Sequence, residues 1–156
     1  MMAGMRQQNM TVNGVRLNVR VGGSGKPLVL LHGAPQSSIM WRKIVPALID
    51  NYTLVCPDLR GYGDSQKTVK GYDKRTMALD IKLLMERLGF QRYGVIGHDR
   101  GGRVAHRLAL DHPDSVENLC LLDIVPTHTL FNETNKELAV AYWHWYFFQI
   151  PDLPEK

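Results

Sequence analysis

The residue with the clearest chemical potential is Asp99, at the centre of the pentapeptide Gly97-His-Asp-Arg-Gly101. The apolar pair Val95 and Ile96 precedes it and a segment with helical spacing follows, which predicts a strand, a tight turn and a helix. Glycines two residues before and after the apex suit a nucleophile elbow, because larger side chains would clash there. A carboxylate at the apex attacks an sp3 carbon without a base and forms an ester. The pattern also fits an ordinary turn in which Asp99 caps the helix.

Two arginines, Arg100 and Arg103, follow this turn and are three residues apart. In the first turn of a helix, both side chains reach the same side of the elbow. Together with the helix N-terminus they predict an anion site beside Asp99. A guanidinium binds a carboxylate as a fork, so we expect a substrate with a carboxylate next to the reacting carbon. The alternative is a solvated helix face.

The elements that must position these residues alternate between strands and helices. Residues 10–21 predict a β-hairpin around Asn13-Gly14. Asp73 and Gly89 bound a predicted helix, and residues 37–49 have helical spacing with an expected break at Pro46. The other expected elements are strands at 28–31, 52–56, 93–98 and 119–123, and helical segments at 101–112 and 133–148. This alternation predicts a parallel α/β sheet.

Composition narrows the class of protein. The length of 156 residues suits one domain, and the basic residues behind the net charge of +4 are scattered, so we expect no nucleic-acid partner. No signal peptide and no membrane segment are expected, which favours a cytoplasmic location. Cys56 and Cys120 lie in separate apolar runs and are expected to be buried free thiols. The sequence implies no cofactor and no metal.

Several motifs occur together in a familiar order. His32-Gly-x-Pro35, Asp58-Leu-Arg-Gly-Tyr-Gly-Asp-Ser65, Gly97-His-Asp-Arg-Gly-Gly102 and Leu122-Asp-Ile-Val-Pro126 resemble the α/β-hydrolase superfamily, in its branch of aspartate-nucleophile dehalogenases and epoxide hydrolases. More narrowly, Asp99-Arg-Gly-Gly-Arg103 and Tyr142-Trp-His-Trp-Tyr146 resemble the fluoroacetate (haloacetate) dehalogenases.

The resemblance implies an α/β-hydrolase fold, a mostly parallel sheet with helices on both faces. Residues 1–126 would form the N-terminal part of the core and 127–156 the start of a helical cap, where the chain is expected to be truncated relative to the family. The family usually has a tryptophan after the nucleophile in its epoxide hydrolases and haloalkane dehalogenases, so Arg100 favours the haloacid branch.

The resemblance also implies roles for further residues. His144 and Trp145 correspond to halide-binding residues, and their ring N–H groups are suitable donors to a departing halide. Asp123 corresponds to the acid that orients the catalytic histidine, although a strand-terminal aspartate also bonds turn amides. His32-Gly33-Ala34 corresponds to the oxyanion loop, with amides from Ala34 and Arg100.

The implied mechanism needs a histidine that activates water against the ester. None of the six histidines stands where the family has it, and His98, beside Asp99, is expected to point away from the nucleophile. Three interpretations stay open. The first is hydrolytic dehalogenation of a small haloacid to a 2-hydroxy acid, with this chain alkylated at Asp99 but not turning over repeatedly. The second is an epoxide hydrolase or other α/β hydrolase, and the third a non-catalytic fragment. A homodimer is left open.

Overall fold

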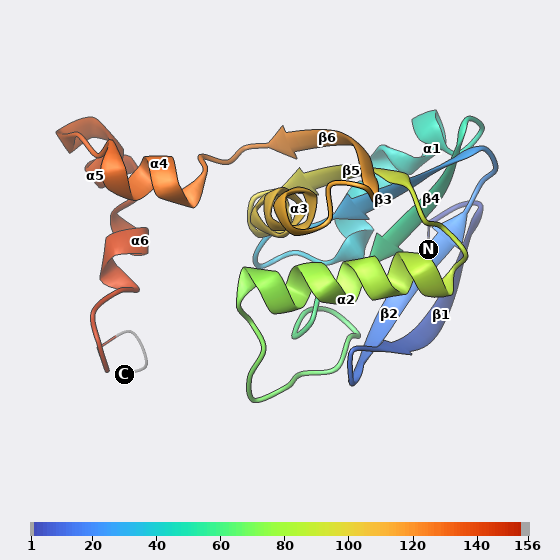
Figure 1. Cartoon of the computed structure of the whole chain (residues 1–156), viewed down its shortest axis with the longest axis horizontal. Helices are drawn as coiled ribbons and strands as arrows, with labels where there is room; N and C mark the ends of the chain where they lie inside the picture. Colours follow the sequence, from blue (N-terminus) through green and yellow to red (C-terminus); the bar gives the residue numbers. More distant parts are fainter. Residues whose placement is uncertain (1, 154–156) are drawn as a thin grey trace. The chain divides into compact units, whose positions relative to one another are not determined.

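The computed structural model describes residues 2–153, and its contacts divide the chain into two compact units, one ending at Ile124 and one beginning at Val125. Figure 1 shows the elements. Those of the first unit are β1 (Met5–Val12), β2 (Val15–Gly22), β3 (Lys26–Leu31), the 3-10 helix η1 (Ser38–Lys43), α1 (Val45–Leu48), β4 (Tyr52–Pro57), α2 (Lys74–Arg87), β5 (Tyr93–His98), α3 (Arg100–Asp111) and β6 (Val116–Leu122).

The strands form one sheet in the order β1-β2-β4-β3-β5-β6. Strands β4, β3, β5 and β6 pair in parallel, whereas β1 with β2 and β2 with β4 are antiparallel. The predicted hairpin is confirmed, with Asn13 and Gly14 at φ 47° and 71° in its turn. The expected α/β class with a mostly parallel sheet is therefore confirmed.

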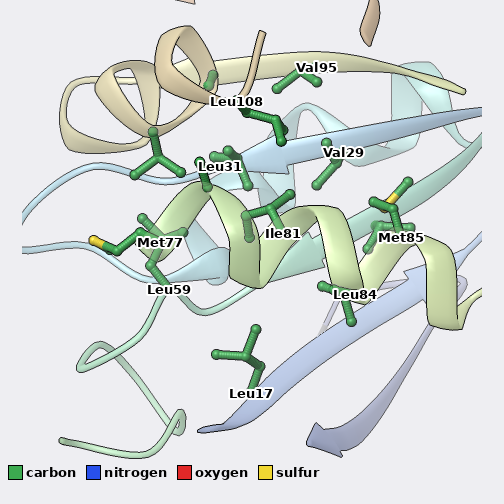
Figure 2. Packing of buried hydrophobic residues seen from close by; sticks show 14 of the residues in the cluster. Leu17, Val29, Leu31, Leu59, Met77, Ile81, Leu84, Met85, Val95 and Leu108 are labelled. Carbon is green, nitrogen blue, oxygen red and sulfur yellow. The ribbon is translucent and has the colours of Figure 1, made fainter. Parts of the chain in front are cut away.

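Helices cover both faces of this sheet, as predicted (Figure 1). Alternate residues of β3 divide between two buried clusters: Val29 and Leu31 pack with α2 and α3, whereas Leu28 and Leu30 pack with Trp41 of η1 and its neighbours. Figure 2 shows the first cluster, in which Ile81 of α2 lies among sheet side chains. Strands buried on both faces are typical of parallel sheets.

Local signals set the helix boundaries. The Asp73 carboxylate accepts a hydrogen bond from the Thr76 amide at 2.9 Å and so caps α2, and Gly89 follows the helix at φ 88°. The expected break in residues 37–49 falls at Ile44, and Pro46 lies in the first turn of α1, where a missing N–H costs least.

The second unit contains α4 (Thr127–Asn132), α5 (Lys136–Ala141) and α6 (Trp143–Phe147). The prediction of one helical segment over 133–148 is wrong, because the helix breaks at Tyr142, which has φ −112° and ψ 27°. Asn135 caps α5 through the Leu138 amide, so the first helix starts later than expected. The aromatic run that follows consists of poor helix formers, which favours a break there.

Strand β6 lies at one edge of the sheet, and four of its consecutive residues, from Glu117 to Cys120, are exposed. Both cysteines are free, but only Cys56 is buried, so the expectation for Cys120 is wrong. A hollow of about 410 Å³ is lined by residues 117–120 of β6, by the N-terminal halves of β3 and β5, and by Leu48 and Tyr52. Among residues 2–153, no helix is long and apolar enough to span a membrane.

Candidate active site

Asp99 is the single residue between β5 and α3, as the strand–turn–helix prediction requires. Its φ of 47° and ψ of −116° lie outside the regions that residues with a Cβ ordinarily adopt. The turn is also tight. A Cβ at Gly97 would lie 2.5 Å from the Gly101 oxygen, and one at Gly101 would overlap the carbonyl oxygens of Leu31 and His32. Both glycines are therefore needed for α3 to approach the sheet so closely.

The Asp99 side chain does not cap α3, which removes the simpler explanation for an aspartate at this position. Its Oδ2 instead accepts a hydrogen bond from the Ala34 amide at 2.8 Å, from the loop after β3. The Asp99 amide donates to the Leu122 carbonyl at 3.1 Å and ties the turn to β6. One carboxylate oxygen of Asp99 thus rests on a backbone donor from the loop after β3.

His32 supports this loop. Its Nε2 accepts a hydrogen bond from the Leu59 amide at 2.9 Å, and its Nδ1 lies 2.8 Å from the Gly33 carbonyl oxygen, to which it can donate. These partners require a neutral ring, and burial lowers the His32 pKa, which agrees. The Gly33 amide donates to Gln36 Oε1 at 3.2 Å. Ala34 is therefore the loop residue whose amide reaches Asp99, while His32 and Gly33 hold its backbone.

Arg100 and Arg103 lie in the first turn of α3, with Arg100 half-buried and Arg103 only 6% exposed. The Arg100 guanidinium carbon lies 5.9 Å from the centre of the Tyr62 ring, within cation–π range. Tyr62 also contacts the His32 ring edge-on, with centroids 5.3 Å apart. One aromatic ring thus contacts both Arg100 and the His32 ring that supports the loop after β3.

Sequence reasoning missed Tyr62, and it also missed Lys74. Lys74 is half-buried at the start of α2, and its Nζ donates to the Tyr72 carbonyl at 3.1 Å. Burial, and then the nearby charges of Arg100 and Arg103, lower the Lys74 pKa to about 8. Tyr62 lies inside the Asp58–Ser65 motif, so its place next to the site could have been predicted from that motif. Lys74 reaches the arginines only through the packing of α2 on α3, which no local pattern indicates.

The loop after β4, which carries Tyr62, is anchored at Asp58. Its carboxylate accepts hydrogen bonds from the Ser38 amide at 2.7 Å, the Asn18 side chain at 2.8 Å and the Asp64 amide at 3.0 Å. Burial alone would raise the Asp58 pKa, but these hydrogen bonds outweigh it and the pKa is lowered.

Further along the same loop, Arg60 makes a second anchor. It donates two hydrogen bonds to Asp80 of α2, at 2.7 and 2.8 Å, in a buried pair. The Arg60–Asp80 pair anchors the loop before Tyr62, and the Asp64 amide, bonded to Asp58, anchors it after Tyr62.

Asp123 follows β6 directly, with φ 53° and an exposed side chain. Its Oδ2 lies 3.6 Å from His98 Nε2. We expected His98 to point away from Asp99, and this is wrong. A Cβ added at Gly33 would lie 2.8 Å from His98 Nδ1 and 2.9 Å from Asp99 Oδ2, so both side chains border Gly33. The expectation assumed that adjacent residues at a turn point apart, and the unusual backbone angles of Asp99 break that assumption.

His144 and Trp145 lie next to each other in α6 of the second unit, with ring centroids 6.4 Å apart. The His144 ring also stacks on Tyr142 within the same unit. Their assignment to a halide site stays a prediction. Within residues 2–153, no group of three or more His, Cys, Asp or Glu side chains is arranged to hold a metal ion.

Comparisons with known proteins agree with this geometry. The family model described as alpha/beta hydrolase fold matches residues 26–151. A fluoroacetate dehalogenase from Burkholderia sp is 51% identical over 162 residues, which cover 100% of this chain and 53% of the relative. A soluble epoxide hydrolase from Corynebacterium sp. (strain C12) is 53% identical over 115 residues, 74% of this chain and 40% of that protein.

A solved structure from Nostoc sp PCC 7120, provisionally assigned as an alpha/beta hydrolase, has a TM-score of 0.94 and 49% identity, over 99% of this chain and 55% of its own. The solved epoxide hydrolase CorEH has a TM-score of 0.87 and 44% identity, over 95% of this chain and 53% of its own. The chain spans about half the length of the curated relatives it matches.

Proposed function

The chain belongs to the α/β-hydrolase family, and from this premise we propose that it takes part in hydrolytic dehalogenation of a small haloacid, a fluoroacetate-like haloacetate, with Asp99 as nucleophile. The observation that carries the proposal is the hydrogen bond from the Ala34 amide to Asp99 Oδ2 at 2.8 Å. It leaves Oδ1 to attack, and the same amide can stabilise an oxyanion on Oδ2 when the resulting ester is hydrolysed.

The first step is a displacement at carbon. Oδ1 of Asp99 forms a bond to the carbon that carries the halogen, and the halide departs with the electrons of the broken bond. The carbon is inverted and an aspartyl ester results. Hydrolysis of that ester would give a 2-hydroxy acid, glycolate in the case of a haloacetate.

Selectivity for an acid is assigned to Arg100 and Arg103. They lie one helical turn from each other beside the nucleophile, where a substrate carboxylate can accept hydrogen bonds from both. The Tyr62 ring against Arg100 restricts that guanidinium, which lowers the entropy lost on binding.

His144 and Trp145 are assigned to the departing halide. Fluoride is a poor leaving group, so its departure needs N–H donors aimed where the charge develops. This assignment is supported by the likeness to the fluoroacetate dehalogenase from Burkholderia sp. A water-activating group and a homodimer are not needed for the ester to form.

A second candidate function is epoxide hydrolysis, favoured by the identity of 53% to the Corynebacterium soluble epoxide hydrolase. Both reactions pass through an ester on Asp99, so the two functions are distinguished by which substrate forms that ester faster. A neutral epoxide gains nothing from two cations beside the nucleophile, whereas a haloacid pairs with them.

Intact-protein mass spectrometry tests the proposal. The chain is incubated with chloroacetate, with its neutral analogue chloroacetamide, or with styrene oxide. We expect a carboxymethyl adduct that peptide mapping locates at Asp99 of the wild-type chain, none at that position of Asp99→Asn, and much slower labelling of Asp99 by chloroacetamide; adducts on the exposed Cys120 thiol are counted separately. In Arg100→Leu the preference for the acid should fall at least about tenfold, the loss of one charged hydrogen bond.

The other outcomes decide against the proposal. Faster labelling by styrene oxide than by chloroacetate would favour the epoxide hydrolase. No adduct from any reagent, in a chain that circular dichroism shows to be folded, would favour a non-catalytic protein.

A further inference from the structure

The arginines around the elbow differ in the groups that hold them. Arg60, on the loop after β4, donates two hydrogen bonds to the Asp80 carboxylate. Arg107, further along α3, donates two hydrogen bonds to Asp111 in the same way. Arg100 is half-buried beside Asp99, yet within residues 2–153 no carboxylate forms an ion pair with its guanidinium.

An aromatic ring takes the place of a carboxylate at Arg100. The guanidinium carbon lies 5.9 Å from the centre of the Tyr62 ring, and Tyr62 is itself half-buried. The ring attracts the positive charge but brings no negative charge of its own. A carboxylate partner would occupy the N–H fork and cancel the charge that a substrate acid needs. The contact with Tyr62 therefore holds Arg100 without competing with a carboxylate ligand.

The Tyr62 ring is held in place from the other side. It contacts the buried His32 ring, with centroids 5.3 Å apart and planes at 69°. Its backbone is fixed as well, because the Tyr62 amide donates to the Leu59 carbonyl at 2.9 Å and the Ser65 amide donates to the Tyr62 carbonyl at 3.0 Å. Arg100 thus rests on a ring that has little freedom to move.

The same support reaches the nucleophile. His32 begins the loop after β3, and two residues later the Ala34 amide donates to Asp99 Oδ2 at 2.8 Å. Arg100 follows Asp99 directly in the chain. Contacts through Tyr62 and His32 therefore connect the Arg100 guanidinium to the loop that binds the Asp99 carboxylate.

We propose that Tyr62 is a positioning residue that sets the preference for acids over neutral substrates by aiming the Arg100 guanidinium, an inference that rests on the proposed function. Tyr62 acts before the substrate binds, because it limits the positions open to Arg100. Less conformational entropy is then lost when a carboxylate binds. A neutral substrate forms no ion pair with Arg100, so its reaction with Asp99 does not depend on Tyr62.

The experiment measures acid preference as the rate of adduct formation at Asp99 with chloroacetate divided by the rate with chloroacetamide, each adduct located by peptide mapping. Tyr62→Leu should lower this ratio about fivefold, the loss of a partly desolvated cation–π contact. The fall should come from chloroacetate alone, as a higher half-saturating concentration. Tyr62→Phe keeps the ring, so its ratio should stay within about twofold of the wild-type value.

Fluorinated phenylalanines at position 62 test the ring without removing it. One, two or three ring fluorines keep the side chain close to its size but weaken the negative face that attracts a cation. The acid preference should fall with each added fluorine, while labelling by chloroacetamide stays constant. This series decides the question even if Tyr62→Leu does not fold.

Two more variants separate positioning from general damage. In an Arg100→Leu chain, adding Tyr62→Leu should lower the acid preference no further, because the group that Tyr62 positions is already gone. Tyr52→Leu is the control, since Tyr52 is also half-buried but begins β4, at the opposite end of the strand from the loop that carries Tyr62. Its acid preference should equal that of the wild type.

An unchanged acid preference in folded Tyr62→Leu, or one that is equal across the fluorinated series, would overturn the role of Tyr62. A loss in Tyr62→Phe as large as in Tyr62→Leu would overturn the role of the ring. An effect of Tyr62→Leu that persists in the Arg100→Leu chain would show that Tyr62 does not act through Arg100. A wild-type chain with no adduct at Asp99, or with no acid preference, overturns the proposed function itself and this inference with it.

Discussion

Replacement of Gly97 by alanine should destabilise the protein and move the anion site, whereas the same change at Gly94 should do neither. Both glycines lie in β5, and neither has a positive φ. A Cβ at Gly97 would lie 2.5 Å from the Gly101 oxygen and 2.7 Å from the Gly102 Cα, two backbone atoms of α3. At Gly94 the nearest atom is the end of the Leu28 side chain at 3.0 Å, which can rotate away.

The comparison of Gly97→Ala with Gly94→Ala isolates the free-energy cost of the steric overlap between β5 and α3. Each substitution removes the same conformational freedom from the unfolded chain, so that contribution cancels between the two variants. Relief of the overlap at Gly97 requires α3 to move by several tenths of an ångström, and overpacking of this kind costs about 1 to 3 kcal/mol. We expect Gly94→Ala to change the free energy of unfolding by no more than about 0.5 kcal/mol.

Urea unfolding followed by far-UV circular dichroism measures both values, and the rate of labelling by chloroacetate reports on the site. Gly97→Ala should also label more slowly, because Arg100 and Arg103 move with α3. Equal stability of the two variants would refute the argument that contact between β5 and α3 requires glycine at position 97. A destabilised Gly97→Ala with an unchanged acid preference would separate the packing of the elbow from its chemistry.

Two more predictions concern the loop that carries Tyr62. Asp80→Asn leaves the buried Arg60 without its charge partner and should lower the free energy of unfolding in urea by about 3 kcal/mol. Arg75→Ala breaks a pair with Asp111 in which the arginine side chain is 72% exposed, and should lower it by less than about 0.5 kcal/mol. Similar losses in the two variants would contradict the argument that burial makes the first pair important. Asp58 has a lowered pKa in the folded protein, so its ionised form stabilises the fold above the ordinary value of 3.8 and that contribution is lost as the pH falls through its folded pKa. The difference in unfolding free energy between wild type and Asp58→Asn should therefore be constant from about pH 5 to 7, roughly a unit or more above the ordinary carboxyl pKa. It should shrink at lower pH. A difference that stays constant down to about pH 2 would contradict the lowered pKa of Asp58.

Much of the fold followed from local signals. Asn13-Gly14 requires positive φ at both turn positions, Asp73 offers a cap to the α2 amides, and Gly89 permits the left-handed end of that helix. These signals act within a few residues, so they can be read along the chain. The break at Tyr142 was missed because no proline or glycine marks it.

The site was predictable where a motif kept its residues together. Asp99, Arg100 and Arg103 are close in sequence, and the elbow geometry follows from the glycines on either side. Tyr62 and Lys74 reach Arg100 through tertiary packing between a loop, α2 and α3, which sequence spacing does not encode. The direction of His98 depended on the backbone angles of a single strained residue, which only a structure supplies.

The two edges of the sheet differ in what they offer to a second molecule. The outer strand β1 presents Arg6, Gln7 and Asn9 among its residues, and polar or charged side chains oppose pairing with another strand. The outer edge of β6 has exposed Leu119 and Cys120 in its centre. Self-association of concentrated protein should therefore begin at β6, and oxidation of the Cys120 thiol would trap such a pair as a covalent dimer.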